Sequence, residues 1–149
     1  MQAAASTIRS VRPELTAGLT ARTGLDDRVL TDLVHGFYAR IRTDPVLGPV
    51  FEARIHDWPS HLDRMVDFWS SVALMTGRYH GAPMPAHLGL PVGWPHFARW
   101  LALFEDTAAQ VCPPEGAALV VDRARRIARN LHAAITRAGP GSVGGRAVL

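Results

Sequence analysis

The sequence predicts an all-α fold with a single domain. Apolar residues recur every three or four positions in four long segments, the spacing that places them on one face of a helix. No apolar–polar alternation typical of a half-buried β-strand stands out in the sequence. Of the 149 residues, 48% are hydrophobic, which is enough for a sizeable core or for a domain that wraps one prosthetic group.

The first strong helix follows a weakly periodic segment. Residues 1–24 are expected to form an N-terminal arm or one short helix. Asp26 and Asp27 suit the positive N-terminal end of the helix that follows. Asp44 ends it, because a residue that precedes proline avoids the helical region. The expected buried face comprises Leu30, Leu33, Val34, Phe37 and Ile41.

A second helix follows the segment PVLGPVFEARI, which is interpreted as a turn-rich connection. Asp57 is the expected N-cap, and Pro59 fits the first turn, where its missing N–H costs little. Gly77 is the expected end of this helix. The expected buried face comprises Leu62, Met65, Val66, Trp69, Val72 and Met75.

The segment RYHGAPMPAHLGLPVGWP contains four prolines, so a long regular helix cannot persist there. His87 is therefore expected on a loop or a very short helix. Connections within helix bundles usually have about two to eight residues. The long interruption between Gly77 and Pro95 therefore predicts that something flat and apolar lies against it.

Two further helices complete the expected domain at 25–139, and the tail at 140–149 is expected to be mobile. Pro95 begins the third helix, and Pro113 with Pro114 begins the fourth. The third helix is expected to bury Phe97, Trp100, Leu101, Phe104, Ala108 and Val111. The fourth is expected to bury Leu119, Val120, Ile127, Leu131 and Ile135.

Composition excludes several classes of protein. Cys112 is the only cysteine, so neither an intrachain disulfide nor a four-cysteine zinc site can form. No apolar run approaches the roughly 20 residues that span a bilayer, and the N-terminus lacks a secretory signal, so a cytoplasmic location is expected. The net charge is only +3. The cluster Arg123, Arg125, Arg126 and Arg129 fits a solvated helix face better than a nucleic-acid interface.

The seven histidines carry no zinc signature, because an HExxH motif and a convincing histidine–carboxylate pattern are both absent. His87 has two interpretations. It is either a loop histidine with ordinary apolar neighbours or the axial ligand of an iron porphyrin, whose metal a neutral imidazole binds. Spacing alone does not separate these two.

Tyr38, His61 and Trp100 each fit ordinary helix packing when taken singly. Taken together, they place hydroxyl, imidazole and indole groups on three different helices. If these helices surround one cavity, all three side chains lie opposite His87. This combination is suited to holding and polarising a diatomic gas.

At these positions the chain resembles the third group of truncated haemoglobins. The resemblance covers roughly residues 26 to 138 and rests on the segments FYARIRTDPVLGPVF, WPSHLDRMVDFW, YHGAPMPAHLGLP and HFARWLALF. It implies a two-over-two helical sandwich around haem b. It also implies that His87 is the proximal ligand and that Tyr38, His61 and Trp100 are the distal catalytic residues.

The resemblance implies further haem contacts. Phe51 corresponds to the family's aromatic wedge, Met65 to an apolar ceiling and Trp69 to a deeper packing residue. Tyr79 lies at a position near the haem edge. The remaining expected contacts are Phe37, Met84 and Phe97.

The implied function is binding of O2, CO or NO, with Tyr38 and Trp100 donating hydrogen bonds to the ligand and His61 as third donor or gate. So polar a pocket favours redox or detoxification chemistry of O2, NO or peroxide over bulk oxygen transport. Haem peroxidase and NO dioxygenase activity are the enzymatic options. Both need an external reductase, because the chain has no flavin or nicotinamide motif. The alternative is a cofactor-free helical interaction or nucleic-acid-binding protein that uses the Arg-rich fourth helix.

Overall fold

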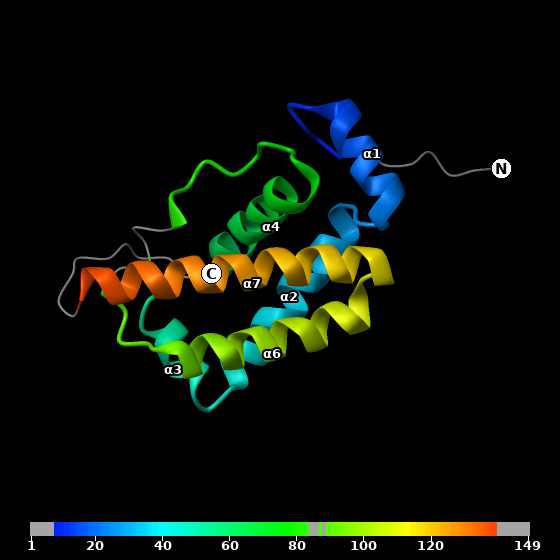
Figure 1. The fold of residues 1–149 in the computed structure, drawn as a ribbon. Helices are drawn as coiled ribbons and strands as arrows, with labels where there is room; N and C mark the ends of the chain where they lie inside the picture. Colours follow the sequence, from blue (N-terminus) through cyan, green and yellow to red (C-terminus); the bar gives the residue numbers. More distant parts are fainter. Residues whose placement is uncertain (1–7, 84–86, 88, 140–149) are drawn as a thin grey trace.

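The computed structural model describes residues 8–83, 87 and 89–139. Every regular element in this described part is a helix, so the all-α prediction is confirmed (Figure 1). In chain order the helices are α1 Pro13–Thr23, α2 Asp27–Thr43, α3 Leu47–Glu52, α4 Trp58–Leu74, α6 Trp94–Val111 and α7 Pro114–Ala138.

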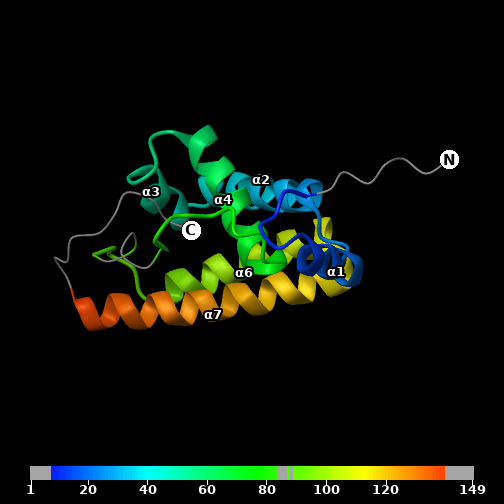
Figure 2. The same ribbon diagram turned by 90° about the horizontal axis from the view of Figure 1, so that it is seen from above.

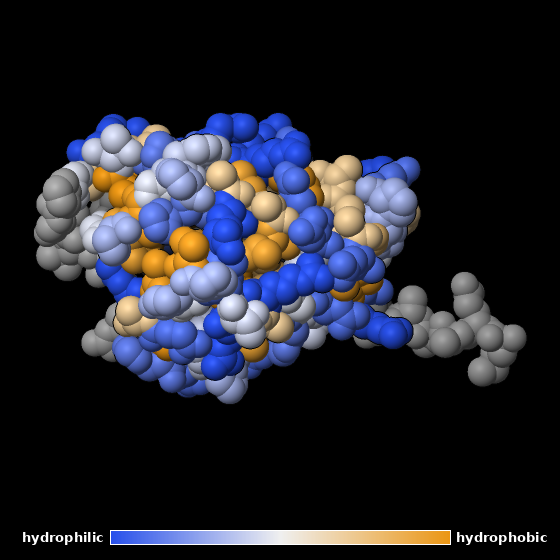
Figure 3. Space-filling view, turned by 90° about the horizontal axis from the view of Figure 1, so that it is seen from below, coloured by the Kyte–Doolittle hydropathy of each residue, from blue (hydrophilic) through white to orange (hydrophobic). Residues whose placement is uncertain are grey.

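The four long helices form two pairs. Helix α6 packs along α7, and α2 packs against both α4 and α6 (Figure 1, Figure 2). Helix α2 therefore connects the two pairs, and its buried side chains reach neighbours in both. The short helix α3 packs against α2 and α6. On the underside of the molecule, hydrophobic side chains are visible in separate areas among hydrophilic ones (Figure 3). Within the described residues, no helix is long and apolar enough to cross a membrane.

Aspartates cap two of the helix starts. Asp57 was the predicted N-cap of its helix, whereas Asp26 was expected only at the positive N-terminal end of its helix. The Asp26 side chain accepts the Val29 N–H at 2.9 Å and begins α2. The Asp57 side chain accepts the Ser60 N–H at 3.2 Å and begins α4. Each bond satisfies one of the N–H groups that the first turn of a helix leaves without a partner. Local sequence therefore fixes where both helices begin.

The segment interpreted as turn-rich contains a helix, α3, and that prediction was wrong. The Asp44 side chain accepts the N–H groups of Val46 and Leu47 at 3.0 and 2.9 Å, which caps the turn. Leu47 and Phe51 are buried on its inner side. Capping and burial together produce a helix in a segment whose local sequence only weakly favours one.

Helix α4 ends at Leu74, before the predicted Gly77. Met75 adopts the left-handed conformation with φ 58° and is exposed, contrary to its predicted burial. A hydrogen bond of 2.7 Å joins the hydroxyl groups of Ser70 and Thr76 and turns the chain away from the helix axis. The buried face also differs from the prediction, since Leu62, Val66 and Val72 are only half-buried. It comprises Trp58, His61, Met65, Phe68, Trp69, Ser70, Ala73 and Leu74.

The later helices agree with the prediction more closely. Helix α6 begins one residue before Pro95, and α7 begins at Pro114. Their buried faces include the predicted Trp100, Phe104 and Leu131. The predicted Leu101, Val111, Leu119 and Ile127 are half-buried. Helix α1 lies within the segment 1–24 and packs against α4 and α7.

Candidate functional site

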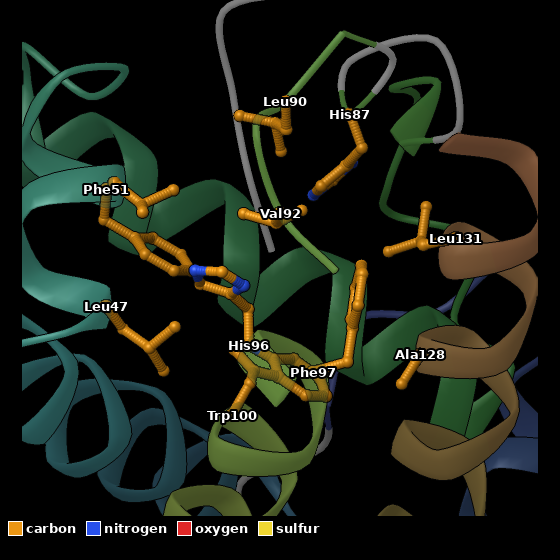
Figure 4. Close-up of a pocket in the computed structure, with 11 residues that line it drawn as sticks. Leu47, Phe51, His87, Leu90, Val92, His96, Phe97, Trp100, Ala128 and Leu131 are labelled. Carbon is orange, nitrogen blue, oxygen red and sulfur yellow. The ribbon is translucent and has the colours of Figure 1, made fainter. Parts of the chain in front are cut away.

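An apolar pocket lies between α3, α6, α7 and the loop that precedes α6 (Figure 4). Its empty volume, including solvent at the mouth, is about 460 Å³. The lining residues are Leu47, Val50, Phe51, His87, Leu90, Val92, His96, Phe97, Trp100, Ala128 and Leu131.

His87 is buried and extends from its loop toward the interior of the pocket (Figure 4). Its Nδ1 lies 2.5 Å from the backbone carbonyl oxygen of Pro83. Because a carbonyl oxygen only accepts hydrogen bonds, Nδ1 carries the proton and Nε2 carries the lone pair. Burial lowers the pKa of His87, and the charge of Arg54 lowers it further. The hydrogen bond to Pro83 acts in the opposite direction and raises it. A neutral imidazole with this tautomer can ligate a metal through Nε2.

Trp100 is buried in the wall of the pocket opposite His87 (Figure 4). Its ring stacks on Phe104 with centroids 5.6 Å apart. It meets the edge of Phe37 at 5.4 Å. Since Phe104 and Phe37 hold the indole on two sides, the orientation of Trp100 is fixed by core packing.

Tyr38 and His61 form a second group beside the pocket. Their rings meet edge to face at 5.1 Å, and the exposed fractions of the two residues are only 2% and 0%. The Tyr38 ring also contacts Phe51 at 5.9 Å, and Phe51 lines the pocket. Burial, with a smaller contribution from Tyr79, raises the pKa of the Tyr38 hydroxyl, which therefore remains a hydrogen-bond donor.

His61 is a buried polar group without a partner. Neither Nδ1 nor Nε2 has a hydrogen bond among the described residues. Burial lowers its pKa to about 4, and Arg64 and His87 add to the lowering. The imidazole is therefore neutral at pH 7, with one donor and one acceptor nitrogen. A buried polar group left unpaired costs about 1–3 kcal/mol, so His61 is an energetically unfavourable feature of the core.

The other candidate residues lie around these two groups. Phe37 lies between Tyr38 and Trp100 and contacts both rings. Met65 is buried, and Trp69 stacks on Phe104 at 4.8 Å. Phe97 lines the pocket, whereas Tyr79 is half-buried against Phe68 at 5.1 Å. Met84 lies outside the described residues.

Two residues of the site were missed from the sequence. His96 lines the pocket, and its Nδ1 accepts the Gly93 N–H at 3.1 Å. Its spacing of four residues from Trp100 was the available signal, because such residues share a helix face. Trp58 contacts the rings of both Tyr38 and His61. It lies three residues before His61, which again places both on one face of α4.

The alternative sites suggested by composition have little geometric support. Among the described residues, no group of three or more His, Cys, Asp or Glu side chains could hold a metal ion. Arg123 and Arg126 form ion pairs with Asp122, and Arg125 pairs with Glu105. Two carboxylates, Asp122 and Glu105, therefore offset part of the positive charge of these three arginines.

Comparison with known proteins first defines the class of this chain as a globin. The crystal structure of group III truncated hemoglobin from Campylobacter jejuni matches it with a TM-score of 0.71 and 31% identity, covering 77% of this chain and 94% of that one. A curated relative, Group 3 truncated hemoglobin ctb from Campylobacter jejuni, is 32% identical over 114 residues, covering 72% of this chain and 89% of the relative. No family model matches the sequence.

The chain therefore belongs to the group 3 truncated haemoglobins. This confirms the family resemblance and the predicted truncated globin fold, a two-over-two sandwich in which α2 and α4 pack on α6 and α7. Membership in this family implies a haem cofactor. The apolar lining of the pocket and the tautomer of His87 fit such a group.

Proposed function

We propose that this chain binds haem b in the pocket beneath His87 and holds a diatomic ligand on the opposite side, next to Tyr38, His61 and Trp100. The observation that carries the proposal is the state of His87. Its neutral ring is buried in an apolar pocket, with Nδ1 committed to the Pro83 carbonyl. A metal ligand held in this way keeps its ring orientation and gains basicity at the ligating nitrogen.

The pocket lining suits the faces of a porphyrin. Phe51, Phe97 and Leu131 supply apolar surface from three different helices. Burial of apolar surface at about 25 cal/mol per Å² would supply much of the affinity for such a large flat group. His87 would hold the iron through Nε2.

When bound, haem supplies an iron that coordinates O2, CO or NO. The protein supplies the surrounding donors. The Tyr38 hydroxyl keeps its proton at neutral pH because burial raises its pKa. The Trp100 indole N–H is a donor that does not ionise at neutral pH. Neutral His61 adds a third donor or a movable gate. Preorganised donors in a dry site act more strongly on developing negative charge than donors in water.

We infer that the role lies in redox or detoxification chemistry of O2, NO or peroxide. Three polar side chains would retain O2 tightly, and a protein that retains O2 tightly is poorly suited to delivering it. Peroxidase or NO dioxygenase turnover would draw electrons from a partner reductase. Sustained consumption of NO or peroxide with an added reductant would support this role, whereas a single stoichiometric reaction would contradict it.

The ligand-stabilising role of Tyr38 and Trp100 is tested by O2 dissociation from the ferrous haem-loaded chain. Tyr38→Phe and Trp100→Phe should each raise the dissociation rate about tenfold, since one hydrogen bond contributes about 1–1.5 kcal/mol. Thr43→Val is the control, because it deletes an exposed hydroxyl from α2, the helix that carries Tyr38. If neither test variant differs from the control, Tyr38 and Trp100 do not stabilise the ligand.

A further inference from the structure

Trp58 covers the buried pair Tyr38 and His61. Its ring lies 6.0 Å from the Tyr38 ring and 5.7 Å from the His61 ring, measured between centroids. Only 9% of Trp58 is exposed, and the pair beneath it is more deeply buried still. Because this packing leaves Tyr38 and His61 without contact with water, a ligand that enters from this side must displace a side chain.

An ion pair holds Trp58 from the outside. The guanidinium carbon of Arg42 lies 4.3 Å from the centroid of the Trp58 ring. Arg42 Nε donates to Glu52 Oε1 at 3.0 Å, and Trp58 Nε1 donates to Glu52 Oε2 at 3.4 Å. The three residues come from α2, α3 and α4. We call Arg42, Glu52 and Trp58 the outer clamp.

The outer clamp is weaker than the core beneath it. The side chains of Arg42 and Glu52 are 45% and 47% exposed. Exposed ion pairs and cation–π contacts contribute little each, and salt screens the ion pair. Phe51 and Met65, which are buried, are held by close packing instead. Thermal motion therefore opens the clamp more readily than it displaces the core.

We propose that Trp58 is a positioning residue for Tyr38 and His61, and that Arg42 and Glu52 hold it closed until a small ligand enters beside this pair. The inference rests on the proposed function, because the ligand is the diatomic gas that the haem would bind. It assigns the access route and two surface residues that touch neither haem nor ligand. Arg42 and Glu52 then control the entry rate without changing the groups that contact the ligand.

The test is CO association after flash photolysis of the ferrous haem-loaded chain. Arg42→Ala and Glu52→Gln should each raise the second-order rate about three- to tenfold, the size expected from losing two weak contacts. Arg42→Lys keeps the charge but loses the planar guanidinium, and should give a rate between those of Arg42→Ala and the wild type. The double variant should be no faster than Arg42→Ala alone, because both changes open one clamp. High ionic strength should raise the wild-type rate and leave the double variant unchanged.

The Arg125–Glu105 ion pair supplies a matched control. Its side chains are 54% and 39% exposed, and it joins α7 to α6 at 2.7 Å. Arg125→Ala should leave CO association at the wild-type rate. Equal rates in Arg42→Ala, Glu52→Gln and this control overturn the clamp. Failure of the wild type to bind CO at all would instead contradict the proposed function.

The positioning role of Trp58 has a spectroscopic readout. The C–O stretching band of the CO complex reports on the donors beside the ligand. Trp58→Ala should shift or broaden this band, because Tyr38 and His61 lose the ring that packs on them. Trp58→Phe keeps an aromatic ring and should largely restore the wild-type band if Trp58→Ala folds poorly. A lowered melting temperature with an unchanged band in both variants would show that Trp58 only supports the fold.

Discussion

The rings of Tyr38 and His61 meet edge to face, with centroids 5.1 Å apart and planes at 87°. This contact orders two polar side chains from α2 and α4 without using the hydrogen-bonding capacity of the imidazole. Both His61 nitrogens lack a partner among the described residues, although the residue is fully buried. Both nitrogens of His61 are therefore available for hydrogen bonds that the described residues do not supply.

Burial of neutral His61 makes the stability of the fold depend on pH. Its pKa is about 4 in the folded chain and 6.5 ordinarily, so the unfolded chain binds the proton more readily. Its contribution to stability therefore falls as the pH decreases from about 6.5 to about 4, by up to about 1.4 kcal/mol per pH unit. Below that range both states are protonated and the dependence ends.

Urea unfolding at a series of pH values checks this expectation. His61→Leu should remove this part of the acid sensitivity and be relatively more stable than the wild type near pH 5. His35→Gln is the control, because His35 is exposed on α2 and should leave the profile unchanged. Parallel profiles for wild type and His61→Leu would contradict a buried neutral imidazole.

Asp44 links α3 to α6 and so supports one wall of the pocket. Its carboxylate accepts the N–H groups of Val46 and Leu47 and pairs with Arg99 at 2.7 Å. The hydrogen bond from Arg99 is the main reason that the pKa of Asp44 is lowered. The stability that the ionised Asp44 carboxylate contributes is therefore present at neutral pH. It is lost as the pH falls through that lowered pKa.

Asp44→Ala should destabilise the chain by about 1–3 kcal/mol, because it removes a helix cap and leaves buried N–H groups without a partner. It should also weaken haem retention, since Leu47 and Phe51 of α3 line the pocket. Urea unfolding and haem transfer to an excess of apomyoglobin measure the two effects. Asp32→Ala removes an exposed carboxylate from α2 and should change neither. If Asp44→Ala matched the wild type in both urea unfolding and haem transfer, α3 would not need this cap.

Local chemistry predicted much of the fold, and tertiary contacts decided the rest. Asp26 and Asp57 cap their helices through residues three positions away, so sequence alone located both starts. Helix α3 was missed because its cap, Asp44, is held by Arg99 from a distant part of the chain. The end of α4 was missed because the hydroxyl contact between Ser70 and Thr76 decides it.

In the candidate site, too, the sequence predicted some residues, whereas tertiary contacts determined others. Residue type and order pointed to His87 and Trp100, and the structure brings both to one pocket. The packing of Trp58 over Tyr38 and His61 depends on where α2 and α4 cross, which helical periodicity does not specify. The assignment of haem-binding and ligand-stabilising roles to these residues stays a proposal.

Gly116 is required where α7 passes close to the end of α1. A Cβ atom there would lie 2.7 Å from Leu25 Cδ2 and 2.8 Å from the backbone oxygen of Thr23. Since the backbone oxygen cannot move without shifting α1, Gly116→Ala should destabilise the chain by about 1–3 kcal/mol. Gly18→Ala is the matched control, because its Cβ would meet only Arg22 Nη1 at 3.5 Å. Thermal unfolding should show a loss for Gly116→Ala and none for Gly18→Ala; equal midpoints would refute the close approach.

The most direct measurement is the visible absorption spectrum of the haem-loaded chain in its oxidised, reduced and CO-bound states. We expect the wild type to show histidine-ligated haem that forms a CO complex. His87→Gly should lose the histidine-ligated spectrum and regain it when imidazole is added. His96→Gly, which alters the other histidine of the same pocket, should keep the wild-type spectrum. A wild-type chain that takes up no haem, or a His87→Gly spectrum identical to the wild type without imidazole, would contradict the account.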